Sequence, residues 1–555
     1  MKKILILSIF IIGVAILSGI AQNIAYLDKT KNKTQLIVDN KPFIMLSGEL
    51  HNSSSSTTEY SAALWPKLKK MNLNSVIASI SWELLEPKEG QYDYKLVDSL
   101  IKNADENNMK LCFIWFASWK NGESSYVPLW VKKDTKRFFR VKDKNGRNIE
   151  TISPFCEEAM RADAKAFGLL LKHIKEVDIN RAVIMIQPEN EVGIFQDIDY
   201  NEIALKTFDK EVPIQLFLYL KKNIKILNEE LKSLWQINGF KTKGTWKEVF
   251  GNNMYTKEFI MAWQYASYIN EVARTGKKEY KLPMYVNAWI VQDPKDSPGV
   301  YPNGGPVSKV MDIYKAAAKD IDVLSPDIYL PNFKEIVAMY HRQDNPLLIP
   351  ESTLDAGRAF YALAEHDAIC FSPFGIEDGA NDFVFAQSYK VLNELMPLIT
   401  EFQGTGKMIG ILKEGEESER SVQLGNYQLK IVYEKKNEPC YGLVIQTSDN
   451  EFLVAGMNLK ITFDSTEKNK IGCIGQVWEG RFENGIWIPS RLLNGDETRN
   501  NRVLKVIGRQ FATTQKQIDT SKTEKTEEQF VYTANKFEKL TTPGIYKVIT
   551  YQLDR

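Results

Sequence analysis

AVIMIQPENE, residues 182–191, joins an apolar run to a polar end that carries two carboxylates and an amide. A run this uniformly apolar is typical of a strand buried on both faces, as in a parallel sheet covered by helices. Stretches of helical periodicity separate it from similar runs, and the full set is 43–49, 75–82, 110–116, 182–189, 284–290, 322–329, 347–351 and 369–374. Eight such units in succession predict an α/β fold, the (β/α)8 TIM barrel.

The pattern changes near Gly404. Downstream, short alternating segments such as YQLKIVYE and YGLVIQTS are separated by Gly, Asn and Asp turns, which is typical of an all-β sandwich. We therefore expect a catalytic barrel over residues 22–404, which begins with a β-hairpin that turns at Asp39–Asn40, and a C-terminal β-sandwich over residues 405–555. A polar, charge-rich stretch at 514–529 is expected to form a loop.

Residues 1–21 have the features of a secretory signal peptide. Two lysines precede an apolar run, and Gly19 and Ala21 supply the small residues for cleavage after position 21. An uncleaved anchor is the alternative, because the run is nearly long enough to span a bilayer. We expect an exported protein, in the periplasm, outside the cell or on its surface, with no stable membrane insertion after cleavage.

The composition excludes several classes of partner. Lys and Arg number 71 against 70 Asp and Glu, so the net charge of +1 is too small to attract nucleic acid. The five cysteines form no CxxC pair and the four histidines no HExxH motif, which argues against a metal site or a disulfide scaffold. No glycine-rich phosphate-binding motif opens a helix, which removes the usual nucleotide-binding alternatives. We expect neither a metal nor an organic cofactor.

The polar strand ends indicate the chemistry, because catalytic groups of such barrels lie at the carboxyl ends of the strands. The fourth run ends at Glu191 and the seventh at Glu351. Two carboxyl groups about 5–5.5 Å apart can cleave a glycosidic bond with retention, one as nucleophile and one as acid/base. An apolar cleft would raise the pKa of Glu191 and suit it to the acid role, which leaves Glu351 as the nucleophile.

Further residues at strand ends are candidates for sugar binding. Asn190 could hold the hydroxyl beside the anomeric carbon, and Tyr329 or an arginine could donate a hydrogen bond to the nucleophile. Trp119 and Trp289 could stack on sugar rings, with core packing as the alternative. His51 could hydrogen-bond a hydroxyl or cap its strand.

These motifs resemble a known family. QPENEVG (187–193) resembles the strand-four motif of clan A retaining glycosidases, most closely the Q-x-E-N-E-Y-G form of the β-galactosidases of glycoside hydrolase family 35. KPFIMLSGELH (41–51) and WELLEPKEGQYDY (82–94) resemble the first strand and the W-N-x-H-E-P segment of that family. SPDIYLPNF (325–333) and the final sandwich favour its bacterial subgroup with a β-rich C-terminal module.

The resemblance implies roles for individual residues. Glu191 would be the acid/base, Glu351 the nucleophile, and Tyr329 would position the nucleophile. Asn190 and Glu86 would contact the reacting sugar. The sequence departs from the family at Val192, where Tyr is usual, at Pro188, at Glu83, where Asn is usual, and around the nucleophile in IPESTLDAG (349–357). These departures leave the identity of that sugar open.

The resemblance thus implies a secreted retaining exo-β-glycosidase, a β-galactosidase that releases terminal β-D-galactose from oligo- or polysaccharides by double displacement. Two enzymatic alternatives are the same mechanism on a β-xyloside, β-glucosaminide or α-L-arabinoside, and an endo-acting glycanase. A pocket closed by the insertion 195–255 would favour exo action, and an open groove endo action. A catalytically silent glycan-binding protein is a third reading, against which both carboxylates count. The oligomeric state stays open.

Overall fold

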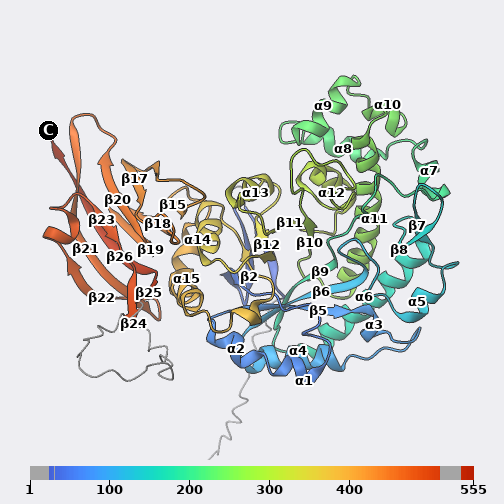
Figure 1. Cartoon of the computed structure of the whole chain (residues 1–555), viewed down its shortest axis with the longest axis horizontal. Helices are drawn as coiled ribbons and strands as arrows, with labels where there is room; N and C mark the ends of the chain where they lie inside the picture. Colours follow the sequence, from blue (N-terminus) through green and yellow to red (C-terminus); the bar gives the residue numbers. More distant parts are fainter. Residues whose placement is uncertain (1–23, 31, 513–538) are drawn as a thin grey trace, which may run out of the picture.

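The computed structural model describes residues 24–30, 32–512 and 539–555. The expected signal peptide at 1–21 and the expected loop at 514–529 lie outside the described residues. Within the described ranges, no helix combines the length and the apolar content that crossing a bilayer requires. A barrel surrounded by helices lies beside a body built of strands (Figure 1).

Eight parallel strands, counted within the described residues, close into the barrel. They are β4 (Met45–Leu46), β5 (Ser75–Ser81), β6 (Lys110–Lys120), β9 (Val183–Asn190), β10 (Tyr285–Trp289), β11 (Val323–Ile328), β12 with β13 (Leu348–Ile349 and Glu351–Ser352) and β14 (Cys370–Phe371). The ladders β5-β6-β9, β10-β11-β13 and β12-β14-β4 are joined by the parallel bridges Ile186–Met284 and Glu49–Ile77. Each strand overlaps one predicted apolar run, so the predicted TIM barrel is confirmed.

The helices that cover the barrel form where the sequence shows helical periodicity. The principal ones are α2 (Trp65–Lys70), α4 (Lys95–Glu106), α6 (Glu157–Val177), α11 (Met254–Glu279), α12 (Met311–Ala317), α13 (Phe333–Tyr340), α14 (Ala356–Glu365) and α15 (Phe383–Phe402). Asp163 lies within the buried face of α6, where its carboxylate accepts a hydrogen bond of 2.8 Å from Trp115 Nε1. Asp163 interrupts the apolar face of the helix because its side chain is hydrogen-bonded inside the core.

A small antiparallel sheet closes the amino end of the barrel. It consists of β1 (Tyr26–Lys29), β2 (Thr34–Val38) and β3 (Lys41–Phe43). Asp39 and Asn40 both have positive φ, 51° and 63°, as a tight two-residue hairpin turn requires. Leu36 and Val38 join the apolar cluster that fills the barrel interior. The carboxyl end of the barrel is therefore the end where a ligand can enter.

The segment between β9 and α11 is a helical insertion, as expected. It contains α7 (Glu202–Thr207), α8 (Ile214–Lys222), α9 (Glu229–Ile237) and α10 (Trp246–Phe250), of which the last three form the group at the top of Figure 1. Trp235 and Trp246 are buried. The insertion is fixed to the barrel helices, since Tyr219 donates to Asp312 of α12 over 3.2 Å.

The C-terminal body is a β-sandwich, which confirms the predicted fold class. One sheet has the order β15-β18-β19-β26-β21-β22 and the other β16-β17-β20-β23. Their bounds are β15 (Met408–Leu412), β16 (Glu419–Leu424), β17 (Tyr427–Tyr433), β18 (Tyr441–Ser448), β19 (Glu451–Met457), β20 (Leu459–Ser465), β21 (Lys470–Glu483), β22 (Ile486–Leu493), β23 (Leu504–Val506) and β26 (Gly544–Asp554). The six-stranded sheet also packs against the barrel, because Tyr441, Leu443 and Leu453 belong to the same apolar cluster as the barrel helices.

Candidate active site

The acid/base candidate lies in a strained turn at the carboxyl end of β9. Glu189 and Glu191 both have positive φ, 63° and 42°. Side chains other than glycine rarely adopt this region, and such strain of about 1–3 kcal/mol per residue persists mainly at functional sites. The turn places Glu191 on the wall of a cavity of about 380 Å³ at the barrel mouth.

Three carboxyl groups meet in this cavity. One oxygen each of Glu191, Asp327 and Glu351 lies within 4.8 Å of the other two. The remaining lining residues are Asn52, Lys120, Asn121, Trp289, Ile290, Gln292, Tyr329 and Phe374. The structure therefore brings together Glu191, Glu351, Tyr329 and Trp289, which the sequence singles out, and adds Asp327, which it does not.

Asn287, on β10, connects the strand ends around the cavity. Its Oδ1 accepts from the backbone N–H of Glu191 and from Nε2 of Gln187, both over 2.9 Å. Its Nδ2 donates to Asp327 Oδ2 over 2.7 Å and to Glu351 Oε1 over 3.2 Å. Four hydrogen bonds allow only one orientation of this amide, so Asn287 fixes the positions of both catalytic candidates.

Glu351 accepts hydrogen bonds from three side chains. Tyr329 donates to Oε2 over 2.7 Å, and Asn190 donates to Oε1 over 3.3 Å beside the bond from Asn287. Donors on both oxygens hold the carboxylate in one orientation, which a nucleophile needs in order to attack a fixed carbon. Tyr329 and Asn190 thus both contact Glu351, as the resemblance implies for Tyr329.

Burial sets the protonation of the other carboxyl groups. It raises the pKa of Glu191 to about 7, and the nearby charge of Glu351 adds to the effect while Lys120 opposes it. Burial, followed by the charge of Glu351, also raises the pKa of Asp327 and of Glu49 well above the usual range. The carboxyl groups around Glu351 therefore keep their protons to higher pH than free carboxyl groups do, as expected of an acid beside a nucleophile.

Two ionisable residues that the sequence does not single out are Lys120, which lines the cavity, and Glu49, which lies near enough to interact electrostatically with Glu351 and Glu191. Glu49 is 1% exposed, and its Oε2 has no hydrogen-bond partner within the described part of the chain. Lys120 is 8% exposed and donates to Asn121 Oδ1 over 2.6 Å. Asp327 and Asn287 were also missed, although each is a polar residue inside an apolar run, a signal that could have revealed them.

Glu189, the other carboxylate of the QPENE segment, faces away from the cavity. It is 1% exposed, and its Oε2 accepts from the backbone N–H of Trp119 over 2.7 Å. Burial and the adjacent Asp163 of α6 raise its pKa well above the usual range. Glu189 is thus a protonated core residue that anchors the end of β9 to the helix layer.

The structure does not place Trp119 in the cavity, which corrects the prediction that it stacks on a sugar. β6 continues to Lys120, beyond the predicted end of the strand at residue 116, so Trp119 still lies in the barrel wall. Its ring is fully buried and lies edge-on to Tyr265 and Tyr268, with centroids 4.8 and 4.5 Å away. Core packing, the alternative reading, describes this residue.

Glu86 and His51 also lie outside the cavity lining. The Glu86 carboxylate is buried and accepts from Trp82 Nε1 over 2.8 Å and from the Gly90 N–H over 2.7 Å, so it shapes the loop after β5. His51 Nε2 lies 2.8 Å from Asp378, and its ring packs edge-on against the cavity residue Phe374. His51 thus supports the wall of the site through Phe374, whereas Glu86 shapes a loop, and neither residue lines the cavity.

The three acidic residues are also the one group in the described residues whose ligand atoms converge closely enough for a metal ion. The raised pKa of Glu191 and Asp327 means that protons reduce the negative charge of the group at neutral pH.

Comparisons with known proteins locate this barrel in a family. Residues 35–278, from β2 through α11, match the model of "Glycosyl hydrolases family 35", and residues 385–505 match a "Domain of unknown function (DUF5597)". Over the matched residues the barrel is similar to glycoside hydrolase family 35. The family 35 match includes Glu191, while Glu351 lies in the barrel strands beyond it.

Individual relatives with a similar sequence are named β-galactosidases. A β-galactosidase of Xanthomonas manihotis is 27% identical over 171 residues, which are 30% of this chain and 26% of that protein. The β-galactosidase LacZ of Lactobacillus acidophilus is 22% identical over 298 residues, 51% of this chain and 41% of that protein. The chain thus spans less than half the length of these relatives.

Among solved structures, the β-galactosidase of Bacillus circulans sp. alkalophilus aligns with 64% of this chain and 57% of its own, at a TM-score of 0.44 and 15% identity. The catalytic domain of a β-amylase from Paenibacillus polymyxa aligns with 60% of this chain and 92% of its own, at a TM-score of 0.43 and 12% identity.

Proposed function

We propose that this chain is an exported, retaining exo-β-glycosidase that releases terminal β-D-galactose from oligo- or polysaccharides. The observation that carries the proposal is the convergence of Glu191 and Glu351, whose nearest oxygens lie within 4.8 Å in the barrel mouth. Retaining enzymes hold their carboxyl groups about 5–5.5 Å apart, whereas inverting enzymes need about 6.5–9.5 Å to admit a water. The short separation supports retention.

The reaction would proceed in two displacements. A Glu351 oxygen attacks the anomeric carbon, the glycosidic C–O bond breaks, and the leaving oxygen takes the proton of Glu191. A water molecule then gives a proton to Glu191 and attacks the same carbon, which releases the sugar and frees Glu351. The pKa of about 7 at Glu191 supports both its acid and its base role near neutral pH.

Galactose is proposed because the matched relatives are named β-galactosidases. The insertion does not supply the expected support for exo action, since no described residue of 195–255 lines the catalytic cavity. Exo action is supported by the small volume of that cavity, about 380 Å³, at the lower end of ligand pockets. Export is supported by the amino-terminal sequence alone.

The test is a panel of aryl β- and α-glycosides of galactose, glucose, xylose and N-acetylglucosamine, assayed with the wild type and Glu351→Gln. We expect turnover of the β-galactoside, release of β-galactose as the first product, and loss of turnover in the variant. If another glycoside is hydrolysed instead, the released sugar is not galactose and that part of the proposal is wrong. Inverted product, or appreciable activity of Glu351→Gln, would refute the retaining mechanism with this nucleophile.

A further inference from the structure

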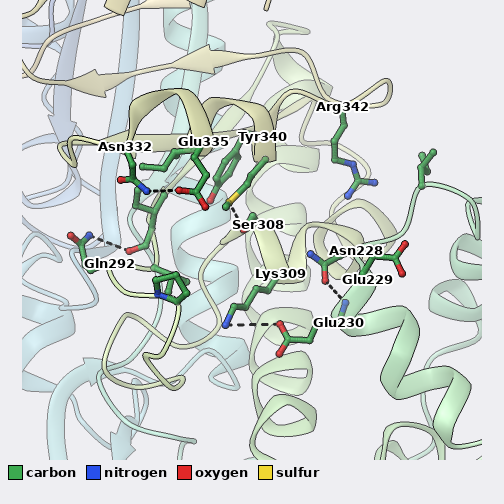
Figure 2. A pocket seen from close by; sticks show the side chains of 16 residues that line it. Asn228, Glu229, Glu230, Gln292, Ser308, Lys309, Asn332, Glu335, Tyr340 and Arg342 are labelled. Carbon is green, nitrogen blue, oxygen red and sulfur yellow. Dashed lines mark hydrogen bonds and ion pairs between the residues drawn. The ribbon is translucent and has the colours of Figure 1, made fainter. Parts of the chain in front are cut away.

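A second cavity, of about 430 Å³, adjoins the catalytic cavity. Figure 2 shows that residues 228–230, at the start of α9, face α13 across it. The loop after β10 forms a third wall, with Ile290, Val291, Gln292 and Pro294. Without the insertion this side of the barrel would be open, because the wall at Ile226–Glu230 comes from the insertion.

The two cavities share two lining residues, Ile290 and Gln292. Both come after Trp289, the last residue of β10, and β10 carries Asn287, which holds Glu191 and Glu351 in place. A ligand long enough to pass over Ile290 would therefore reach from the catalytic carboxylates into the second cavity. No comparable continuity links the catalytic cavity to the other described hollows, since none of them shares a lining residue with it.

The lining suits a neutral polar ligand with apolar faces. Apolar side chains form much of the wall, among them Ile226 and Met339, which are 37% and 45% exposed. The charged groups of the rim have partners: Lys309 lies 3.9 Å from Glu230, and Arg342 binds Asp312 over 2.8 Å.

Hydrogen-bonding groups without charge stand beside these pairs. Asn332 donates to Glu335 over 2.9 Å, and Gln292 donates to the Ile290 carbonyl over 3.2 Å (Figure 2). Each side-chain amide can form further hydrogen bonds, which a ligand could use. Aliphatic walls with a few amides on the rim match a pyranose, whose C–H faces pack on apolar surface while its hydroxyls bond at the edge.

We propose that the second cavity is the binding site for the saccharide on the leaving-group side of the scissile bond. The inference rests on the proposed function: an exo-acting enzyme holds the terminal sugar at its carboxylates, so any further sugar lies on the leaving-group side. The insertion then selects substrates by the group to which the terminal sugar is linked. A glycan chain attached to that sugar is the occupant, and a substrate without one leaves the cavity empty.

The experiment compares two substrates that share the accepted glycone. A glycosyl fluoride has a one-atom leaving group that cannot reach the second cavity, and a tetrasaccharide can fill it. Ile226→Trp and Met339→Trp place a bulky ring in the cavity, and Ile237→Trp is the matched control, since Ile237 lies on α9, is 80% exposed and does not line the cavity.

We expect both cavity variants to lower kcat/KM for the tetrasaccharide about tenfold, which corresponds to about 1.4 kcal/mol, and to leave the fluoride unaffected. Equal effects on both substrates, or none on either, would overturn the inference. The cleavage products show which side of the scissile bond the second cavity binds. Release of an oligosaccharide from the non-reducing end would place the glycone side in this cavity and would also overturn the inference.

Binding without turnover separates this inference from the proposed function. Glu351→Gln is titrated with the free trisaccharide that corresponds to the leaving group, with and without Met339→Trp, by calorimetry. Binding that Met339→Trp abolishes supports the saccharide site even if the wild type hydrolyses no substrate offered. Absence of binding to Glu351→Gln, with the glycosyl fluoride turned over normally by the wild type, refutes the site and leaves the proposed function intact.

Discussion

Glu191→Gln should make the protein more stable at alkaline pH, although it removes a group at the centre of the site. Burial raises the pKa of Glu191 from 4.5 to about 7. Between these values the unfolded chain ionises while the folded chain keeps its proton, so the folded state binds more protons and the free energy of unfolding falls as pH rises. Glutamine does not titrate and escapes this loss.

The magnitude is set by the difference between the two pKa values. Roughly 2.5 pKa units at about 1.4 kcal/mol each give about 3 kcal/mol of stability that the wild type loses between pH 4.5 and pH 8. Glu191 is only 6% exposed, so solvent screens little of this penalty. The favourable bond between the Glu191 N–H and Asn287 involves the backbone and survives the substitution.

The assay is urea denaturation of the wild type and Glu191→Gln at pH 5, 6, 7 and 8, followed by tryptophan fluorescence. Glu202→Gln, at an exposed position of the insertion, serves as the control for loss of a surface carboxylate. The stability difference between Glu191→Gln and the wild type should grow by about 2.5 kcal/mol from pH 5 to pH 8, since part of the loss has already occurred by pH 5. A difference that stays constant with pH would show that Glu191 is not a buried, raised-pKa acid.

Further predictions concern catalysis and the barrel wall. Glu191→Ala should reduce kcat far less for aryl glycosides with activated leaving groups than for natural ones, which need protonation; equal losses would exclude the acid role. The kcat/KM of the wild type should fall as pH rises through about 7, as the acid loses its proton, and Glu191→Ala should lack this limb. Asn287→Ala should lower kcat by about 10²–10³-fold with little change in KM, because it frees both carboxyl groups; an unchanged kcat would show that Asn287 positions neither. Trp119→Phe should cost about 1–3 kcal/mol of stability through the unpaired Ile152 carbonyl and leave KM unaltered, and a raised KM would restore Trp119 to the site.

The barrel could be predicted from the sequence because its strands are apolar on both faces. A run as apolar as residues 182–186 indicates a strand buried on both faces. The Asp39–Asn40 turn was predictable because a two-residue hairpin turn depends mainly on the residues that form it. The catalytic carboxylates were predictable for the complementary reason, since charge directly after a buried strand is costly unless it faces a functional cavity.

Which of the other polar residues face the cavity could not be predicted, because that depends on where strands end and which way their side chains point. Asp327 and Asn287 lie inside apolar runs, and uniform runs carry no alternation that separates inward from outward positions. Glu189 and Glu191 are two residues apart, yet the left-handed turns at both direct one to the helix layer and the other to the cavity. Trp119 was misplaced because β6 continues to Lys120, four residues beyond the predicted strand end, and keeps Trp119 in the barrel wall.

The sandwich is joined to the barrel by shared core as well as by chain. Residues of β15, β18 and β19, such as Met408 and Leu443, belong to one apolar cluster with α14 and α15, and Arg420 binds Glu365 over 2.6 Å. The matched unit of unknown function likewise starts inside α15, at residue 385. The helices α14 and α15 are therefore buried on one side by the barrel and on the other by the sandwich. A barrel cut from its sandwich would uncover that layer, so the two bodies are expected to melt together and to be exchanged between proteins only as a pair.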